Sequence, residues 1–508
     1  MSGGGIVNVD DLKSGAADPE IGISKRVELA EEHNYELDVD PEQDDRATEI
    51  KISSIRQPHM RAFHASWIAF FSAFVAWFSA APLLPIIKKA LGLTKKEIWA
   101  SNICSIASTI AMRFAVGPLC DMYGPKTVMS LILIVCSIPV YLIGTVTTFS
   151  GLCTVRFFIG AIGSTFVMCQ YWSSQMFAKN VVGTANAIVG GWGNLGGGVT
   201  QLFMGAAMYP LFLHVFTKGD VELAWRSVFV VPATMTIAVG ILIYFYSQDT
   251  PHGDFKDLKA KNDMPPTNSL LSFFEGMKNL NTVLLFIQYG CCFGVELTMN
   301  NAATTYFVEE LDQDNVRAAS IASSFGFMNL VARALGGIVS DYLNVHLGMR
   351  GRLLTQFVLL LLEGIMILVF AAQKELGAAI GTMIIFSLFV QASEGASFAL
   401  VPYVDPPNMG SVAGIVGAGG NTGALYFGFA FLYGKNFLES LNMMGYIVIA
   451  SSVLTFFIRI PGHAMLIGGA DVKELQASNS RKSFGAAASR GGKNPLAPSM
   501  SADSVHKK

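Results

Sequence analysis

The sequence predicts an all-α membrane protein of about 12 transmembrane helices, arranged in two pseudo-symmetric six-helix halves. Of its 508 residues, 52% are hydrophobic and only 14% are charged, whereas a soluble chain carries roughly 25% charged residues. Its apolar runs are about 20 residues long, which is the length that a helix needs to cross the ~30 Å hydrocarbon core of a bilayer. Two polar motifs inside these runs occur once in each half.

Twelve apolar stretches define the expected transmembrane helices. They cover residues 64–87, 97–119, 126–147, 151–176, 184–212, 225–247, 283–306, 317–340, 352–372, 377–402, 410–433 and 443–461. The polar stretch 248–282 separates the first six from the last six. The expected domains are an N-terminal tail (1–60), an N-terminal bundle (61–247), a central loop (248–282), a C-terminal bundle (283–461) and a C-terminal tail (462–508). Both tails have the polar composition of disordered segments.

The distribution of basic residues predicts the orientation in the membrane. Lys and Arg are more frequent on the side that carries both tails and the central loop, and the positive-inside rule assigns that side to the cytoplasm. The exception is the first outer loop, which contains Lys88, Lys89, Lys95 and Lys96. We therefore expect a multi-pass protein of the plasma membrane with both termini cytoplasmic.

The chain carries no pattern typical of an enzyme. All seven cysteines lie in or next to apolar runs, where cysteine behaves as a small hydrophobic residue. The loops contain neither a nucleophile–base set nor a cluster of metal-ligating residues. We therefore expect no catalytic activity, no metal or other cofactor, and no nucleic-acid partner. The lipid bilayer is the expected surrounding.

An internal repeat places matched charges in the two halves. Arg113-x3-Gly117-x3-Asp121 recurs 220 positions later with Arg333 and Asp341 at the same spacing. A second echo is formed by two glycine-rich stripes, one in each half: Gly191, Gly193, Gly196 and Gly197, and Gly417, Gly419, Gly420 and Gly423. Such repeats are typical of duplicated transporters.

The repeated arginines are predicted near the middle of the membrane. Each lies eight residues before an aspartate that ends its span, which corresponds to about 12 Å of helix. An arginine at a helix centre costs about 2.5–3.5 kcal/mol on insertion scales, and it stays charged. Arg113 and Arg333 must therefore face a polar interior. Their planar guanidiniums suit a small oxyanion held from both sides, and the alternative is a structural ion pair with an intramembrane carboxylate.

The glycine stripes have an ordinary explanation, because small residues let transmembrane helices approach closely. The two asparagines inside the stripes, Asn194 and Asn421, are more informative. Either amide could donate a hydrogen bond to an anion, or bind a facing backbone carbonyl.

These motifs resemble those of a known transporter family. The stretch Gly-Trp-Gly-Asn-Leu-Gly-Gly-Gly at 191–198, the second stripe at 417–423 and the paired arginines are similar to the nitrate/nitrite porter family of the major facilitator superfamily. The segment 117–126 is similar to the superfamily's signature between spans 2 and 3. The resemblance covers about residues 60 to 461, and the short central loop is similar to plant and algal high-affinity nitrate transporters.

The resemblance implies roles for individual residues. Arg113 and Arg333 would clamp nitrate, and Asn194 and Asn421 are candidates to hydrogen-bond it. Aromatic side chains would enclose the planar anion; they are Phe166, Tyr289 and Phe293. With 36 phenylalanines in an apolar chain, an ordinary packing role is the alternative for Phe166 and Phe293.

Proton coupling and gating involve a further set of charges. Glu296 and Glu394 are the candidates to carry a proton, since each lies inside an apolar span; Glu363 is a weaker one. A permanently ionised partner for one arginine is the alternative role of Glu296. By resemblance, two charge pairs would latch the cytoplasmic side: Asp121 with Lys126, and Asp341 with Arg350 or Arg352.

The expected function is proton-coupled uptake of nitrate, and with it nitrite, by alternating access. The alternatives are a nitrate/nitrite exchanger, a carrier of another small anion, and a nitrate-sensing receptor that signals through its tails. Many plant-type relatives require a small single-span accessory protein, which makes such a protein a candidate partner.

Overall fold

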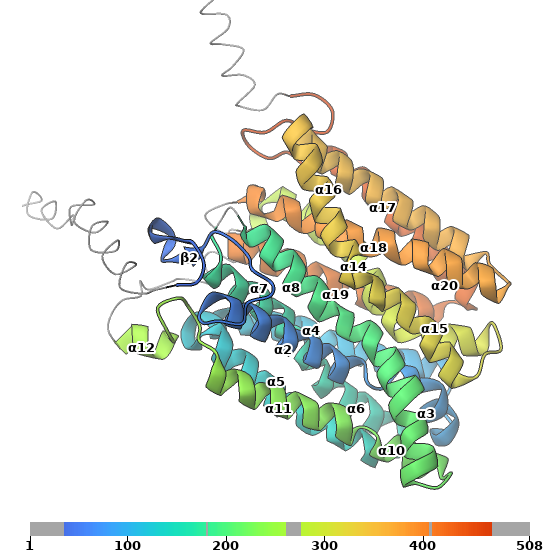
Figure 1. The fold of residues 1–508 in the computed structure, drawn as a ribbon. Coiled ribbons are helices and arrows are strands. Elements are labelled where there is room, and N and C mark those ends of the chain that lie inside the picture. The colour runs from blue at the N-terminus through green and yellow to red at the C-terminus, as the bar shows by residue number, and fades with distance from the viewer. Residues whose placement is uncertain (1–34, 179–180, 261–275, 406–408, 470–508) are drawn as a thin grey trace, which may run out of the picture.

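The computed structural model describes residues 35–178, 181–260, 276–405 and 409–469, apart from the side chains of Phe114, Pro118, Asp121 and Met409. Figure 1 shows two helical bundles side by side. Most of both expected tails, residues 1–34 and 470–508, lies outside the described residues.

The first bundle is formed by the helices before residue 247. They are α2 (His59–Phe78), α3 (Leu84–Leu91), α4 (Lys95–Tyr123), α5 (Pro125–Leu142), α6 (Phe149–Gly160), α7 (Thr165–Met176), α8 (Val182–Thr200), α9 (Tyr209–Leu211), α10 (Val221–Ser227) and α11 (Val230–Tyr246). Shorter helical elements continue some of these spans. Three are 3-10 helices, η3 (Ala81–Leu83), η4 (Ile143–Thr145) and η5 (Ala161–Ser164), and two are π-helices, η6 (Gln201–Met208) and η7 (Phe212–Phe216).

The second bundle follows the short helix α12 (Phe255–Ala260). It contains α14 (Leu280–Glu309), α15 (Asn315–Phe327), η8 (Met328–Leu330), α16 (Ala332–Leu347), α17 (Met349–Ala371), α18 (Leu376–Val404), α19 (Met409–Tyr433), α20 (Phe437–Ser452) and η10 (Val453–Phe457). The alternation of up and down spans follows from the short connections between them.

The expected transmembrane segments coincide with helices. Among the described residues, eleven helical segments are long and apolar enough to cross a membrane. The remaining one, α4, has 29 residues and is about 44 Å long. It carries a row of buried polar side chains: Ser101, Ser105, Ser108, Thr109 and Arg113. Polar residues of this kind face a bundle interior rather than lipid, and the twelve-helix prediction is confirmed.

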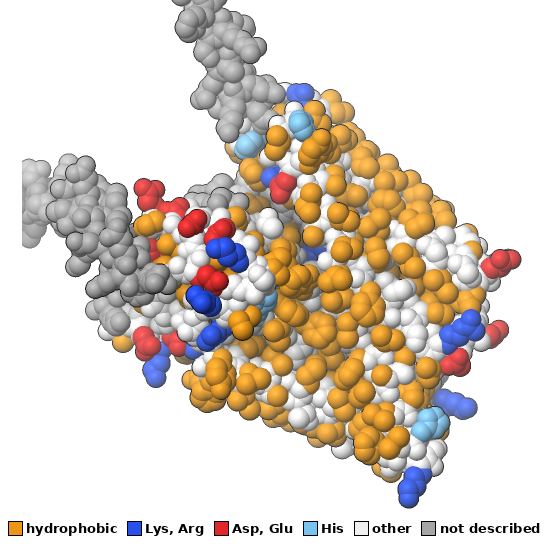
Figure 2. All heavy atoms as spheres, in the orientation of Figure 1, with side chains coloured by type: hydrophobic (Ala, Val, Ile, Leu, Met, Phe, Trp, Pro, Cys, Tyr) orange, Lys and Arg blue, Asp and Glu red, His pale blue; other side chains and the backbone are white. Residues whose placement is uncertain are grey.

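The surface agrees with a membrane environment. Figure 2 shows hydrophobic side chains covering the flanks of both bundles, whereas Lys, Arg, Asp and Glu gather at the two ends. Isoleucine, leucine and phenylalanine exposed on these flanks, such as Phe245 at 73% and Ile338 at 60%, would be costly in water. We call the end that carries the start of α2 and the end of α20 the termini end, and the other the opposite end.

One segment differs from the expectation for the N-terminal tail. Residues 35–58 were expected to be disordered within the tail 1–60, but they form a small antiparallel hairpin of β1 (Val39–Asp40) and β2 (Arg46–Ala47) at the termini end. The carbonyl of Ala47 accepts a hydrogen bond from Ala178 N at 2.9 Å. The ring of His59 contacts Asp45 O at 2.8 Å. Composition alone did not reveal these contacts, because backbone groups make most of them.

Glycines let the helices of the second bundle touch at their backbones. Helices α14 and α19 run in close contact, and a Cβ at Gly423 would overlap the carbonyl oxygen of Gly290. A similar contact joins the two bundles: a Cβ at Gly198 of α8 would lie 2.5 Å from the Cα of Gly326 in α15. These contacts explain the glycine content of the spans as a packing requirement.

The two bundles are held together at the opposite end and near the middle. Lys88 Nζ lies 2.6 Å from Glu309 Oε1, and Asn315 Nδ2 donates to Pro82 O at 3.0 Å. Gln201 Nε2 donates to Asn300 O at 2.6 Å. Each of these contacts lies at the opposite end or near the middle of the bundles. The bundles are therefore closed together at the opposite end.

We predict that Gly423→Ala destabilises the protein by about 1–3 kcal/mol, because the new methyl group meets a backbone carbonyl that cannot rotate away. Thermal unfolding of the full chain in detergent measures the effect. The control is Gly381→Ala in α18, where a Cβ meets nothing within 4 Å. Equal unfolding temperatures for the two variants would contradict the packing role of Gly423.

Candidate anion-binding site

The structure brings the two repeated arginines together. Arg113 of α4 and Arg333 of α16 are both buried near the middle of the bundles. The guanidinium carbons of both lie over the ring of Phe166, at 4.9 Å for Arg113 and 5.9 Å for Arg333. The proximity that the repeat suggested is therefore present in the fold.

Arg333 is neutralised by a carboxylate. Its Nη1 lies 2.5 Å from Glu394 Oε2, and its Nη2 donates to the hydroxyl of Tyr289 at 3.0 Å. All three side chains are buried. A buried guanidinium needs such compensation, because removing a charge from water costs several kcal/mol.

Arg113 is surrounded by neutral oxygens. It donates to the carbonyls of Gly417 and of Gly163, the latter at 3.3 Å. When the amide of Asn421 is turned so that its oxygen faces the guanidinium, that oxygen lies 2.7 Å from Nη1 and 2.9 Å from Nε. None of the Asp and Glu side chains in the described ranges forms an ion pair with Arg113. The positive charge of this residue is therefore available to an anion.

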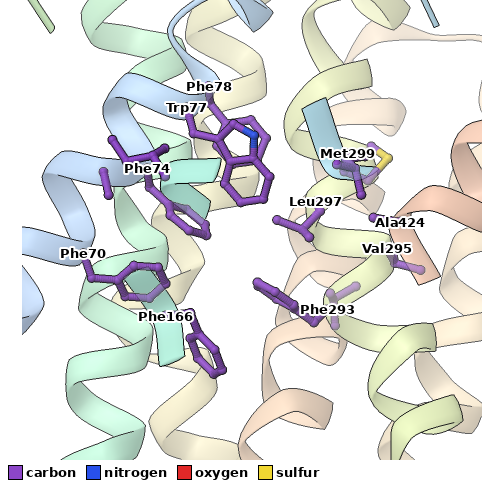
Figure 3. Packing of buried hydrophobic residues seen from close by; sticks show 14 of the residues in the cluster. Phe70, Phe74, Trp77, Phe78, Phe166, Phe293, Val295, Leu297, Met299 and Ala424 are labelled. Carbon is purple, nitrogen blue, oxygen red and sulfur yellow. The ribbon is translucent and has the colours of Figure 1, made fainter. Parts of the chain in front are cut away.

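Aromatic rings form one wall of the site. Figure 3 shows Phe166 and Phe293 facing one another from the two bundles. Their ring centroids are 5.9 Å apart with an interplanar angle of 27°, and Phe293 stacks on Tyr289 at 5.4 Å. Arg113 lies 5.7 Å from the Phe293 ring. The three aromatic residues expected at the site are therefore neighbours, and nearly parallel rings suit a planar guest.

A further ring was missed from the sequence. Phe398 of α18 lies 4.9 Å from Tyr289 and 5.9 Å from the guanidinium carbon of Arg333. Nothing in the sequence distinguishes it from the other phenylalanines. Only its position four residues after Glu394, one helical turn along α18, ties it to the site.

Asn194 links the two carboxylates instead of binding an arginine. Its Nδ2 lies 3.4 Å from Glu296 Oε2 and 3.4 Å from Glu394 Oε2. Glu296 Oε1 also accepts from Asn329 Nδ2 at 2.8 Å. Asn329 was not foreseen, although it is a polar residue in the middle of the expected span 317–340. Glu296 is thus held by two amides, with no guanidinium bound to it.

Two of the motif glycines border the arginines. A Cβ at Gly191 would lie 3.0 Å from Asn329 O and 3.5 Å from the Cβ of Arg333. A Cβ at Gly417 would lie 3.1 Å from the Phe166 ring and 3.7 Å from Arg113 Nη1. Larger residues at these two positions would fill the space beside the guanidiniums.

The other motif glycines allow close packing around the site. A Cβ at Gly193 would overlap the ring of Phe70, and one at Gly196 would overlap the carbonyl oxygen of Phe71. A Cβ at Gly197 would meet the side chain of Asn300, and one at Gly419 would overlap the carbonyl oxygen of Phe286. A Cβ at Gly420 would overlap the Phe293 ring, and one at Gly423 would overlap the carbonyl oxygen of Gly290.

The expected latch residues of the first half lie at the termini end. Lys126 Nζ is 2.5 Å from Asp254 Oδ2, and its backbone N donates to Asp249 Oδ1 at 2.8 Å. The side chain of its expected partner, Asp121, lies outside the described residues. Burial raises the pKa of Asp249 to about 6, and the N–H groups of Lys126 and Phe255 oppose that rise. Asp249 and Asp254 were not foreseen, because they lie in the expected central loop.

In the second half, Asp341 pairs with Arg352. Asp341 Oδ1 lies 2.7 Å from Arg352 Nη2, whereas Arg350 donates to the carbonyl of Gly469. Of the two partners considered for Asp341, the structure selects Arg352, because the turn between α16 and α17 directs Arg350 toward the C-terminal segment. Both charge pairs join elements on one side of the molecule and do not bridge the two bundles.

Comparisons with known proteins agree with this architecture. A family model for the Major Facilitator Superfamily matches residues 66–428. The chain is 35% identical to "High-affinity nitrate transporter 2.3" of Oryza sativa subsp. japonica, over 89% of this chain and 89% of that protein. It is 36% identical to "Nitrate transporter 2.2" of Chlamydomonas reinhardtii, over 82% of each.

Solved structures show the same fold at low sequence identity. A bacterial homolog of the human lysosomal transporter Spinster, in an inward-facing and occupied conformation, has a TM-score of 0.58 at 15% identity. The match covers 79% of this chain and 97% of that one. The chain therefore belongs to the Major Facilitator Superfamily of transporters, in the family that contains the plant and algal high-affinity nitrate transporters.

Proposed function

We propose that this protein takes up nitrate, and with it nitrite, across the plasma membrane by proton-coupled symport. The observation that carries the proposal is the buried guanidinium of Arg113, which has only neutral oxygens around it and lies beside the stacked rings of Phe166 and Phe293. The names of the relatives, which are nitrate transporters, support nitrate as the anion.

Nitrate matches the geometry of this site. It is planar and carries one negative charge, so two of its oxygens can accept parallel hydrogen bonds from one guanidinium. Flat aromatic faces enclose it without competing for those bonds. In a water-poor interior, the attraction between the anion and Arg113 is much stronger than in water. The amide of Asn421 keeps the guanidinium oriented.

Glu394 offers a direct route for proton coupling. Its carboxylate binds Arg333 Nη1. An anion that binds both arginines must therefore compete with this carboxylate for Nη1. A proton on Glu394 removes that competition and frees Arg333 for the anion. The shared amide of Asn194 keeps Glu296 close enough to accept the proton in turn, since two neighbouring carboxylates disfavour a second charge.

Alternating access then follows from the closure of the bundles. We propose that the termini end is cytoplasmic, so the structure is sealed toward the outside by contacts such as Lys88 with Glu309. An anion between Arg113 and Arg333 would draw the two bundles together around the site and allow the outer contacts to part. The charge pairs Lys126–Asp254 and Asp341–Arg352 stabilise the cytoplasmic ends of the helices. We retain a small single-span protein as a candidate partner.

We predict that Arg113→Lys and Arg333→Lys each lower nitrate uptake by about tenfold or more. A lysine keeps the charge but loses the planar pair of donors, and about 1.4 kcal/mol of binding energy corresponds to tenfold. Uptake of labelled nitrate into oocytes, normalised to protein at the surface, measures the effect. The control is Arg459→Lys, whose side chain is exposed. Unchanged uptake by both site variants would contradict the proposal that Arg113 and Arg333 bind nitrate together.

We also predict that Glu394→Gln uncouples uptake from protons. A neutral glutamine leaves Arg333 free at every pH, so nitrate flux is expected to lose its dependence on the pH gradient. Nitrate-evoked current at external pH 5.5 and 7.5 measures this, with Glu296→Gln as a second variant. The control on the same helix is the exposed Glu375→Gln. A wild-type pH dependence in both buried variants would exclude the pair as the proton carrier.

A further inference from the structure

A second buried arginine also lacks a carboxylate. Arg156 of α6 is 3% exposed. Its Nη1 donates to Ser101 Oγ at 3.0 Å and to Asn102 Oδ1, and its Nη2 donates to Asn301 Oδ1 at 3.2 Å. Among the described residues, no Asp or Glu forms an ion pair with it. Arg156 therefore shares with Arg113 the property that marks the proposed nitrate site: a buried positive charge held only by neutral oxygens.

Arg156 lies between the opposite end and that site. It is seven residues from the start of α6 at the opposite end, or about 10 Å along the helix axis. Arg113 is eighteen residues from the start of α4 at the same end, or about 27 Å. Asn102, which binds Arg156, lies roughly 16 Å before Arg113 on α4. The two arginines therefore lie at different depths, with Arg156 nearer the opposite end.

A recess at the opposite end lies next to the side chains that bind Arg156. Two of the acceptors of Arg156, Asn102 and Asn301, line it. Lys88, Lys95, Thr305 and Glu309 also line it, and Glu309 is the ion-pair partner of Lys88. The hydroxyl of Thr305 is buried without a hydrogen-bond partner, which leaves a donor free for a guest. The recess thus presents two ammonium groups and one carboxylate, and the guanidinium of Arg156 lies behind its Asn102 and Asn301.

We propose that Arg156, with Asn102 and Thr305, forms a first binding station for a small oxyanion on its way to Arg113, and that Asn301 occupies Arg156 Nη2 while the bundles are closed. This inference rests on the proposed function, and it assigns nitrate a second site. Lys88 and Lys95 raise the local concentration of anions at the mouth of the recess.

The station opens when the bundles part at this end. The bond from Arg156 to Asn301 joins α6 of the first bundle to α14 of the second, and the pair of Lys88 with Glu309 does the same at the surface. Separation breaks both contacts. It leaves Arg156 Nη2 without its acceptor and Lys88 without its counter-charge, so both can take an anion from outside.

The test compares the two directions of transport. In sided proteoliposomes that contain the full chain, Arg156→Gln is expected to raise the half-saturating nitrate concentration about tenfold for entry from the opposite end. The value for entry from the termini end should stay within about twofold, because that route does not pass Arg156. Equal changes in both directions, or a change only in maximum rate, would mean that Arg156 acts as a structural clamp.

A second variant keeps the inference testable if Arg156→Gln does not reach the membrane. Asn301→Ala removes the bond between the bundles and leaves the guanidinium in place, so it is expected to lower the half-saturating concentration from the opposite end. An unchanged or higher half-saturating concentration would contradict the proposal that Arg156 forms a first binding station. If wild-type protein carries no nitrate, the proposed function fails; if it does, and both variants match wild type, only the station fails.

Discussion

The structure depends on compensating the positive charges that are buried inside its membrane-embedded bundles. An arginine cannot lose its proton, so every guanidinium inside the bundles needs oxygen atoms around it. Arg333 obtains them from Glu394 and Tyr289, and Arg113 obtains them from two backbone carbonyls and the Asn421 amide. The close approach of the helices, which glycines permit, is what brings those oxygens within reach.

A symmetric sequence motif produces an asymmetric site. The two arginines occupy equivalent positions of the repeat, but only the second half supplies carboxylates near them. The first half therefore presents a cation, and the second half presents a cation with its counter-charge. In the proposed symport mechanism, this division would separate two tasks, because the first half would attract the anion and the second half would exchange the proton.

The sequence was sufficient for the architecture and for part of the site. Hydropathy defined the spans, and the shared spacing to Asp121 and Asp341 placed Arg113 and Arg333 at one depth. The partners could not be predicted, because they depend on the rotation of helices distant in sequence. Asn194 illustrates this: its amide was expected at the anion and instead joins two carboxylates.

Residues outside the motifs could not be predicted from the sequence for a similar reason. Phe398 is one phenylalanine among 36, and the hairpin at residues 35–58 joins the first bundle through contacts such as Ala178 N to Ala47 O and His59 to Asp45 O. The local amino-acid composition does not predict such contacts. They become apparent only once the bundles provide a surface for them.

The contact between Gly198 and Gly326 has a consequence for the rate at which the two bundles reorient. At this point the two bundles meet backbone to backbone, with no side chains interlocked. Such a contact can act as a fulcrum, since one helix can roll over the other without first unpacking a set of rotamers. The barrier to reorientation is then set by the polar contacts on either side of the fulcrum, and natural variation at these two glycines would alter the turnover rate more than the affinity.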